Sequence, residues 1–389
     1  MIRALFVAML GFAAPALADA ATDAFLEAEA VTATQVATVP AALNDKAWDK
    51  TPVATFKVSA QRSVRLNDKK ANALLEQPGF GEIRVRALAS PTELGILVAW
   101  NDATRDVLRT DETNTFADSV AIEIPTSFGA GKRLPYVGMG DVDMPVRLYM
   151  QRAQTKGSVA NEYVAAGFGS LTRVPKRQAA MAMEYDSGTK LWRALFIRPL
   201  TVEGSSLERQ SLVPVAFAVW DGARDERGGY KQLSAWHVVK MPTPALDLAY
   251  AKYLSWGYGP GELGDPEKGR AIAETVCVAC HHLPGKTFAS PGVAPNLSNI
   301  GAIASPIYLR ESIVNSSGVI IHALQPNAHY SKSSPPDKNG AYPNADAYQW
   351  SATEPNGKVI SRMPPFNVYT PDQVGDLVAF LKTLDGTKK

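Results

Sequence analysis

The sequence predicts a two-domain protein, in which an antiparallel β-sandwich is followed by an all-α domain. Its 389 residues suit two domains better than one. Up to about residue 245, short runs of β-branched and aromatic residues alternate with turn signals. After about residue 262, the apolar residues recur at helical spacing. We therefore expect a sandwich over residues 22–245, a linker rich in glycine and proline over 246–261, and a helical domain over 262–389.

Residues 1–18 precede the sandwich and predict a secretory signal peptide. Arg3 stands ahead of an apolar run at residues 4–14, and Ala16-Leu17-Ala18 supplies small residues for a cleavage site. The run is too short for a transmembrane helix, and no later segment is long and apolar enough to cross a bilayer. We expect a mature protein in the periplasm with no membrane span. The alternative is that the run is retained as an N-terminal anchor.

The secondary-structure signals follow the same division. Runs of β-branched and aromatic residues predict strands at residues 81–88, 94–100 and 215–220. Helical apolar periods, each with a proline at the first turn, predict helices at residues 266–276, 306–314 and 371–384. A hydrophobic content of 46% and a charged content of 20% are typical of a globular protein with a sizeable core. The formal charge of +2, without any run of Lys or Arg, argues against a nucleic-acid partner.

The most specific motif is Cys277-Val278-Ala279-Cys280-His281, a C-x-x-C-H sequence that is typical of covalent c-type haem attachment. The two thiols would bond to the macrocycle, and His281 would ligate its iron. Cys277 and Cys280 are the only cysteines of the sequence, so we expect no disulfide. The alternatives are a redox dithiol, which needs a βαβ context, and a zinc site, which needs two more ligands nearby. The flanking sequence supplies neither.

From about residue 261 onward, the sequence resembles class I cytochromes c. The matching stretches are a helix before the haem motif, a proline-bearing loop, a middle helix, and a methionine loop with the final helix, at residues 265–271, 294–297, 308–315 and 361–374. The resemblance implies that a carbonyl of the proline loop orients His281 and that Met363 is the second iron ligand. A thioether in this position raises the reduction potential. The competing ligands are His322 and His329, which lie between the middle helix and Met363.

Over about residues 35–245, the sequence resembles the haem-binding γ subunits of ethylbenzene dehydrogenase, dimethylsulfide dehydrogenase, selenate reductase and chlorate reductase. The matching stretches follow the family's order, at residues 43–48, 98–102, 116–125, 138–141, 145–146, 216–222 and 231–237. The resemblance implies a DOMON-like β-sandwich that holds one non-covalent b-type haem between a methionine and a lysine.

Carried over by position, the b-haem ligands fall on Met139 and Lys231, with Met144 and Lys240 as the nearest rivals. A lysine can ligate iron only when it is deprotonated, and burial favours the neutral amine. His237 is the only histidine of this domain, so two histidines cannot share the iron here. If haem binds to the sandwich, an unusual ligand pair is required.

Together, the two resemblances imply a periplasmic dihaem electron-transfer protein that is not itself an enzyme. The sequence shows no recognisable nucleophile with its base and no proton-transfer constellation. We expect the haem subunit of a molybdopterin oxidoreductase, relaying electrons between the iron–sulfur subunit of that complex and a soluble cytochrome or respiratory chain. One alternative is a stand-alone periplasmic c-type cytochrome. Another is a cytochrome whose sandwich binds a sugar or other small ligand in place of haem b.

Overall fold

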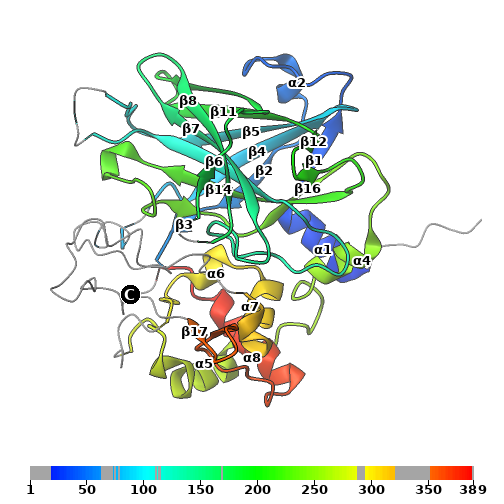
Figure 1. Ribbon diagram of the computed structural model, residues 1–389, viewed down its shortest axis with the longest axis vertical. Helices are drawn as coiled ribbons and strands as arrows, with labels where there is room; N and C mark the ends of the chain where they lie inside the picture. The colour runs from blue at the N-terminus through cyan, green and yellow to red at the C-terminus, as the bar shows by residue number, and fades with distance from the viewer. Residues whose placement is uncertain are drawn as a thin grey trace, which may run out of the picture.

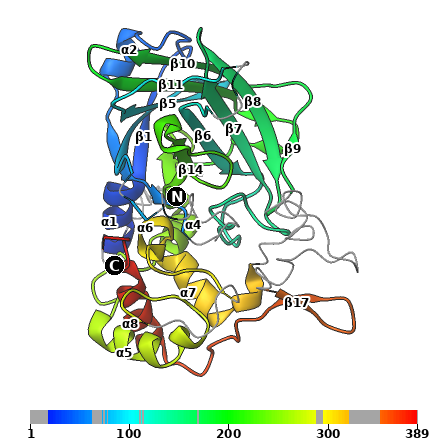
Figure 2. The same cartoon turned by 90° about the vertical axis from the view of Figure 1, so that its left-hand side faces the viewer.

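The chain folds into a large β-structure that stands against a smaller helical body (Figure 1 and Figure 2). The computed structural model describes residues 19–62, 73, 76–77, 79–109, 112, 115–167, 170–286, 294–319 and 351–387. The predicted fold class is confirmed, because a sandwich-like β-region comes first in the chain and an α-helical region follows it. The expected signal peptide, residues 1–18, lies outside the described residues.

The β-region is built on a mainly antiparallel sheet that folds over into two facing layers (Figure 2). One layer has the order β10–β11–β5–β4 and the other the order β16–β14–β6–β7–β8–β9, with β1 between β4 and β16. The predicted strands at 81–88, 94–100 and 215–220 correspond to β4, β5 and β14. The strands of the β-region are β1 (Ala30–Gln35), β2 (Ala54–Lys57), β3 (Ser59–Ala60), β4 (Glu82–Ala89), β5 (Glu93–Asn101), β6 (Ser119–Pro125), β7 (Val146–Ala153), β8 (Ser158–Ala165), β9 (Thr172–Arg173), β10 (Ala180–Asp186), β11 (Leu191–Pro199), β12 (Thr201–Val202), β13 (Ser205–Ser206), β14 (Leu212–Trp220), β15 (Gln232–Leu233) and β16 (His237–Lys240).

Strand β1 departs from the antiparallel pattern, because it pairs in parallel with both of its neighbours. Its first half, from Ala30 to Thr32, pairs with β16, and its second half, from Ala33 to Gln35, pairs with β4. One short strand therefore passes from one layer to the other and joins them.

The space between the layers is filled by apolar side chains from both. All residues of β6 and β14 are buried, as expected for strands with a covered face on each side. Trp100 of β5 and Trp192 of β11 stack within the core with their ring centres 6.0 Å apart. Across the layers, the Gln151 amide donates a hydrogen bond of 3.1 Å to the Leu195 carbonyl.

The helical region confirms the three predicted helices as α5, α7 and α8. Each begins with proline in its first turn and a side-chain cap, from Asp265, Ser305 and Thr370. The helices of the whole chain are α1 (Ala20–Glu29), α2 (Lys46–Asp49), α4 (Leu248–Leu254), α5 (Pro266–Thr275), α6 (Ile300–Ile303), α7 (Pro306–Val314) and α8 (Pro371–Lys382), with short 3-10 turns at Gly222–Arg224, Cys277–Ala279 and Ser316–Gly318. A hairpin of β17 (Ser351–Thr353) and β18 (Val359–Ser361) precedes α8.

Helices α5 and α8 cross at Gly269. A Cβ atom at this position would lie only 1.9 Å from the carbonyl oxygen of Asp376, so the contact requires a glycine. The crossing brings the helix before the haem motif against the last helix of the chain.

Residues 246–261, expected to be a linker, contain α4. Tyr250, Ala251 and Leu254 of this helix are buried in the core of the β-region. Part of the connection between the two regions is thus a helix that packs against the β-region. No helix among the described residues has the length and apolar character needed to cross a membrane.

Candidate functional site

The C-x-x-C-H motif forms a tight turn directly after α5. Cys277 begins a 3-10 turn, and its carbonyl accepts hydrogen bonds from the amides of Cys280, at 3.1 Å, and His281, at 2.8 Å. The turn holds the two cysteines and the histidine together, as attachment of a haem through both thiols requires. Cys277 is half-buried and Cys280 is exposed.

The His281 ring is oriented by the proline-bearing loop, as the sequence predicted. Its Nδ1 atom lies 2.8 Å from the carbonyl oxygen of Pro295. Since a carbonyl can only accept, Nδ1 carries the proton and Nε2 keeps its lone pair for a metal. Burial lowers the pKa of His281, although the bond to Pro295 acts in the opposite direction. The imidazole is therefore held in the neutral, ligating form.

Met363 lies half-buried in the loop between β18 and α8. Its amide donates a 3.1 Å hydrogen bond to Ser361 Oγ, and the hydroxyl of Ser316 donates to its carbonyl. A few residues on, the Phe366 amide donates to the Ile313 carbonyl at 2.9 Å, which fastens the loop to α7.

This loop and the haem motif meet in one apolar cluster. Phe366, Tyr369 and Cys277 all pack against it, and burial and the nearby Cys277 thiol both raise the pKa of Tyr369. The competing ligands His322 and His329 lie outside the described residues.

The sandwich holds a pocket that brings Met139 and Lys231 together. Its empty volume is about 300 Å³, a figure that includes space open to solvent. The rivals Met144 and Lys240 are not among its lining residues. The pocket is lined by Ala121, Ile122, Glu123, Val137, Gly138, Met139, Leu148, Ala216, Phe217, Ala218, Trp220, Lys231 and Leu233.

Lys231 is unusual for a lysine, since only 6% of its surface is exposed. Burial lowers its pKa, and the carboxylate of Glu123 opposes that shift. Its Nζ atom lies 5.7 Å from the centre of the Trp220 ring. Lys231 therefore loses its proton more easily than an exposed lysine, and iron ligation needs this neutral amine.

Glu123 is a pocket residue that the sequence alone did not bring to attention. It is buried on β6, and burial raises its pKa well above the ordinary value, against the effects of Lys231 and the Met139 amide. The signal that could have found it is a single charge within the apolar run of residues 120–125.

Met139 lies in a turn with a strained backbone conformation. Its φ angle is +104°, a region that residues other than glycine rarely occupy. The flanking Gly138 lies under the Tyr136 ring, where a Cβ atom would come within 2.6 Å of a ring carbon. A two-point ion pair between Arg133 and Asp141, at 2.6 and 2.8 Å, secures the end of the turn. The backbone at Met139 is thus constrained on both sides.

The donor chemistry of these residues suits a haem iron. The lining is mostly apolar, and the two groups able to ligate a soft or borderline metal are a thioether and an amine whose neutral form burial favours. Met139 and Lys231 would hold the iron of such a haem.

The two candidate sites share one apolar cluster. It contains the core of the helical region, including Leu297, Ile313 and Leu377, and Cys277 packs against it. Four pocket-lining residues of the sandwich belong to the same cluster: Ala121, Ala218, Trp220 and Leu233. Apolar packing is therefore continuous from the sandwich pocket to the C-x-x-C-H turn.

Comparisons with known proteins agree with both resemblances. Residues 266–385 match the cytochrome c family. The chain is 32% identical over 156 residues to the chlorate reductase subunit gamma of Ideonella dechloratans and 31% identical over 156 residues to the dimethylsulfide dehydrogenase subunit gamma of Rhodovulum sulfidophilum. It is 27% identical over 187 residues to ORF7 of Haloferax mediterranei, described as a respiratory nitrate reductase heme subunit.

These matches are partial. They cover 39%, 38% and 47% of this chain, and 62%, 56% and 58% of the relatives from Ideonella, Rhodovulum and Haloferax. Among solved structures, a family 9 carbohydrate-binding module from Caldicellulosiruptor kristjanssonii aligns over 56% of this chain and 97% of its own, with a low TM-score of 0.30 and 8% identity. In its two regions, the chain is thus similar to the gamma and haem subunits of these oxidoreductases and to cytochrome c.

Proposed function

We propose that this chain is a dihaem electron-transfer protein, with a covalent haem c in the helical region and a non-covalent haem b in the sandwich. The observation that carries the proposal is that Met139 and the buried Lys231 line one pocket. These are the two residues that the family resemblance implies as ligands, and their rivals Met144 and Lys240 do not line the pocket.

Each haem would supply an iron centre that accepts and returns single electrons. The residues of the chain would bind each haem and determine the environment of its iron. Cys277 and Cys280 would hold haem c covalently, and His281 and Met363 would ligate its iron. The Pro295 carbonyl keeps His281 in the tautomer that a metal needs. In the sandwich, the mostly apolar lining and the burial of Lys231 favour the neutral form of its amine.

The shared apolar cluster supports direct electron exchange between the two sites. Trp220 and Leu233 belong both to the pocket lining and to the cluster against which Cys277 packs. Electrons could therefore pass within the chain without an intervening layer of solvent.

The proposed partner is a molybdopterin oxidoreductase with an iron–sulfur subunit, and the proposed second partner is a soluble cytochrome or another component of a respiratory chain. The names of the relatives from Ideonella and Rhodovulum support the first partner, since both are gamma subunits of oxidoreductases. The signal-like sequence at residues 1–18 supports a periplasmic location. Substrate chemistry would take place in the partner, and this chain would serve as the relay.

A pyridine haemochrome spectrum of the periplasmically matured protein tests the proposal. Haem is quantified per chain before and after acid–acetone extraction. We expect one extractable haem b and one retained haem c. If only a retained haem c is found, the haem b part of the proposal is wrong. That result would favour the alternative in which the sandwich binds a sugar or another small ligand.

A second measurement addresses the partner. Purification from the native source at native expression level should recover the chain with molybdenum and iron–sulfur subunits. Recovery as a monomer free of molybdenum would leave a stand-alone cytochrome as the better description.

A further inference from the structure

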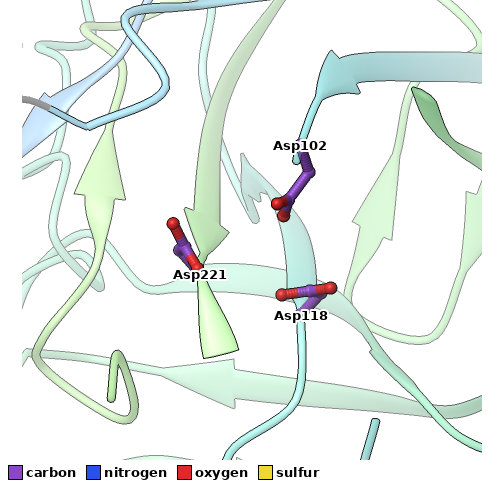
Figure 3. Close-up of side chains that lie close together, drawn as sticks. All are labelled: Asp102, Asp118 and Asp221. Carbon is purple, nitrogen blue, oxygen red and sulfur yellow. The ribbon is translucent and has the colours of Figure 1, made fainter. Parts of the chain in front are cut away.

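We propose that the β-region binds one calcium ion between Asp102, Asp118 and Asp221, at the end of the sandwich where three strands meet. Asp102 directly follows β5, Asp118 directly precedes β6, and Asp221 directly follows β14 (Figure 3). One carboxylate oxygen from each residue lies within 4.8 Å of the others. Oxygens that bind the same calcium ion at about 2.3–2.6 Å lie no more than about 5 Å apart, so this spacing suits a shared ion.

Asp118 is the most buried member of the group. Its side chain is fully buried and accepts three hydrogen bonds, from the amides of Asp106 and Gly222 at 2.7 and 2.9 Å and from Trp192 Nε1 at 3.0 Å. Both oxygens of Asp118 therefore act as hydrogen-bond acceptors.

Asp102 and Asp221 each have a buried carboxylate oxygen that accepts no hydrogen bond from the residues that the structure describes, which points to a bound cation. Asp102 is 5% exposed, and its Oδ1 accepts hydrogen bonds from the amide and hydroxyl of Thr104, at 3.1 and 3.4 Å. Its Oδ2 is buried without any hydrogen-bond partner among the described residues, and the same is true of Asp221 Oδ1. In Figure 3 the Asp102 carboxylate is directed towards that of Asp118. Buried carboxylate oxygens without a donor are costly unless a cation binds them.

Within the described part of the chain, none of the three aspartates forms an ion pair with a Lys or Arg. Arg224 acts to lower the pKa of Asp221, but its ion pair, at 3.6 Å, is with Glu226. The half-buried Asp106 adds a fourth carboxylate nearby. A divalent cation would satisfy both orphaned oxygens and offset the repulsion between the carboxylates.

The donor set favours calcium. All the side-chain donors are oxygens, which excludes metals that prefer nitrogen or sulfur. The aspartates come from three separate strand ends, and two of them are buried, so a small ion that retains most of its water shell fits poorly. Calcium tolerates irregular geometry and sheds water readily, whereas magnesium demands an octahedron and keeps several waters.

Calorimetric titration of the haem-loaded, full-length protein with CaCl₂ after treatment with EDTA tests the site. We expect one calcium ion per chain and a rise in the temperature of unfolding with calcium, because an ion that binds only the folded state stabilises it. Asp102→Asn and Asp221→Asn keep the side-chain shape and remove a charge, and each should weaken calcium binding at least about tenfold. Asp186→Asn is the matched control, because Asp186 is exposed on β10 outside the group.

The proposal is overturned if the wild-type protein shows no binding up to about 10 mM calcium, which exceeds the dissociation constants of weak extracellular calcium modules. Unchanged binding in both Asp102→Asn and Asp221→Asn would also overturn it, as would equal binding of magnesium. Asp221 is half-buried, so Asp221→Asn should fold even if Asp102→Asn does not. Calcium binding can then still be compared between Asp221→Asn and the wild type. The haem content is measured separately, so failure here is distinguishable from failure of the dihaem proposal.

Discussion

The Nζ atom of Lys231 lies 5.7 Å from the centre of the Trp220 ring, and that indole belongs to the apolar cluster shared by the two regions. Trp220 is held in place by a 3.1 Å hydrogen bond from its Nε1 to the Gly228 carbonyl. The proposed b-haem ligand is therefore in contact with a residue of the interface between the two regions. Changes at Lys231 and changes at that interface should influence each other.

The first prediction concerns the proposed ligands in the sandwich. Lys231→Ala and Met139→Ala should each abolish or strongly weaken the binding of haem b and leave haem c in place, because they remove one of two axial ligands. The measurement is haem b per chain with the absorption spectrum of the reduced protein. Lys240→Ala is the control, since Lys240 on β16 does not line the pocket. A haem b content that persists unchanged in Lys231→Ala would assign the ligand elsewhere.

The second prediction concerns Met363. Met363→His should lower the reduction potential of haem c by roughly 0.1 V or more, since axial ligands set haem potentials over a span of about 0.8 V. A potentiometric titration monitored at the haem c bands measures the change. Met150→Leu is a suitable control, because Met150 packs against the same cluster from β7. If the potential does not move, Met363 is not the ligand, and His322 and His329 become the next residues to replace.

The third prediction concerns the helix crossing. Gly269→Ala should destabilise the helical region by about 1–3 kcal/mol, because a methyl group would overlap the Asp376 carbonyl and force α5 and α8 apart. Denaturant unfolding followed by helical circular dichroism measures the loss. Lys268→Ala, at an exposed neighbouring position, should change stability by less than about 0.5 kcal/mol. Equal stability of the two variants would show that the crossing can relax.

The fourth prediction concerns pH. Tyr253 of α4 donates a 2.9 Å hydrogen bond to Glu311 of α7, and burial raises the pKa of Glu311 above its ordinary value of 4.5. Between pH 4.5 and the raised value, the folded state holds a proton that the unfolded state has lost. This residue's contribution to the free energy of unfolding therefore falls as the pH rises through that window.

Glu311→Gln stays neutral at every pH, so the slope of its stability against pH just above 4.5 should be more positive than that of the wild type. Chemical unfolding at a series of pH values from about 4 to about 7 gives the slope. Glu27→Gln, at an exposed position on α1, should keep the wild-type slope. Identical slopes for all three proteins would contradict the assigned role of Glu311.

The features that sequence could predict are those encoded locally. The C-x-x-C-H turn, the proline loop at Pro295 and helices α5, α7 and α8 depend on residues close together in the chain, and the structure has them where the sequence indicates. The apolar runs of β4, β5 and β14 indicate these strands equally well. The pairing of the Met139 turn with Lys231 follows from the family resemblance and not from any local pattern.

The features that sequence could not predict depend on long-range packing. The parallel pairing of β1 with β4 and β16 is decided by strands far along the chain. The glycine and proline that follow α4 indicate a linker, yet Tyr250 and Leu254 are buried against the β-region. Glu123 is hard to recognise from sequence because its importance comes from its position beside Lys231 in the pocket.

Helix α4 and the shared apolar cluster affect how the rate of internal electron transfer depends on solvent viscosity. A haem domain on a loose tether must diffuse to its neighbour before each transfer, so its turnover slows as the solvent becomes more viscous. In this chain, α4 is seated in the β-region, and the cluster joins the two proposed sites. Internal electron exchange should therefore keep its rate in glycerol or sucrose, while exchange with outside partners slows.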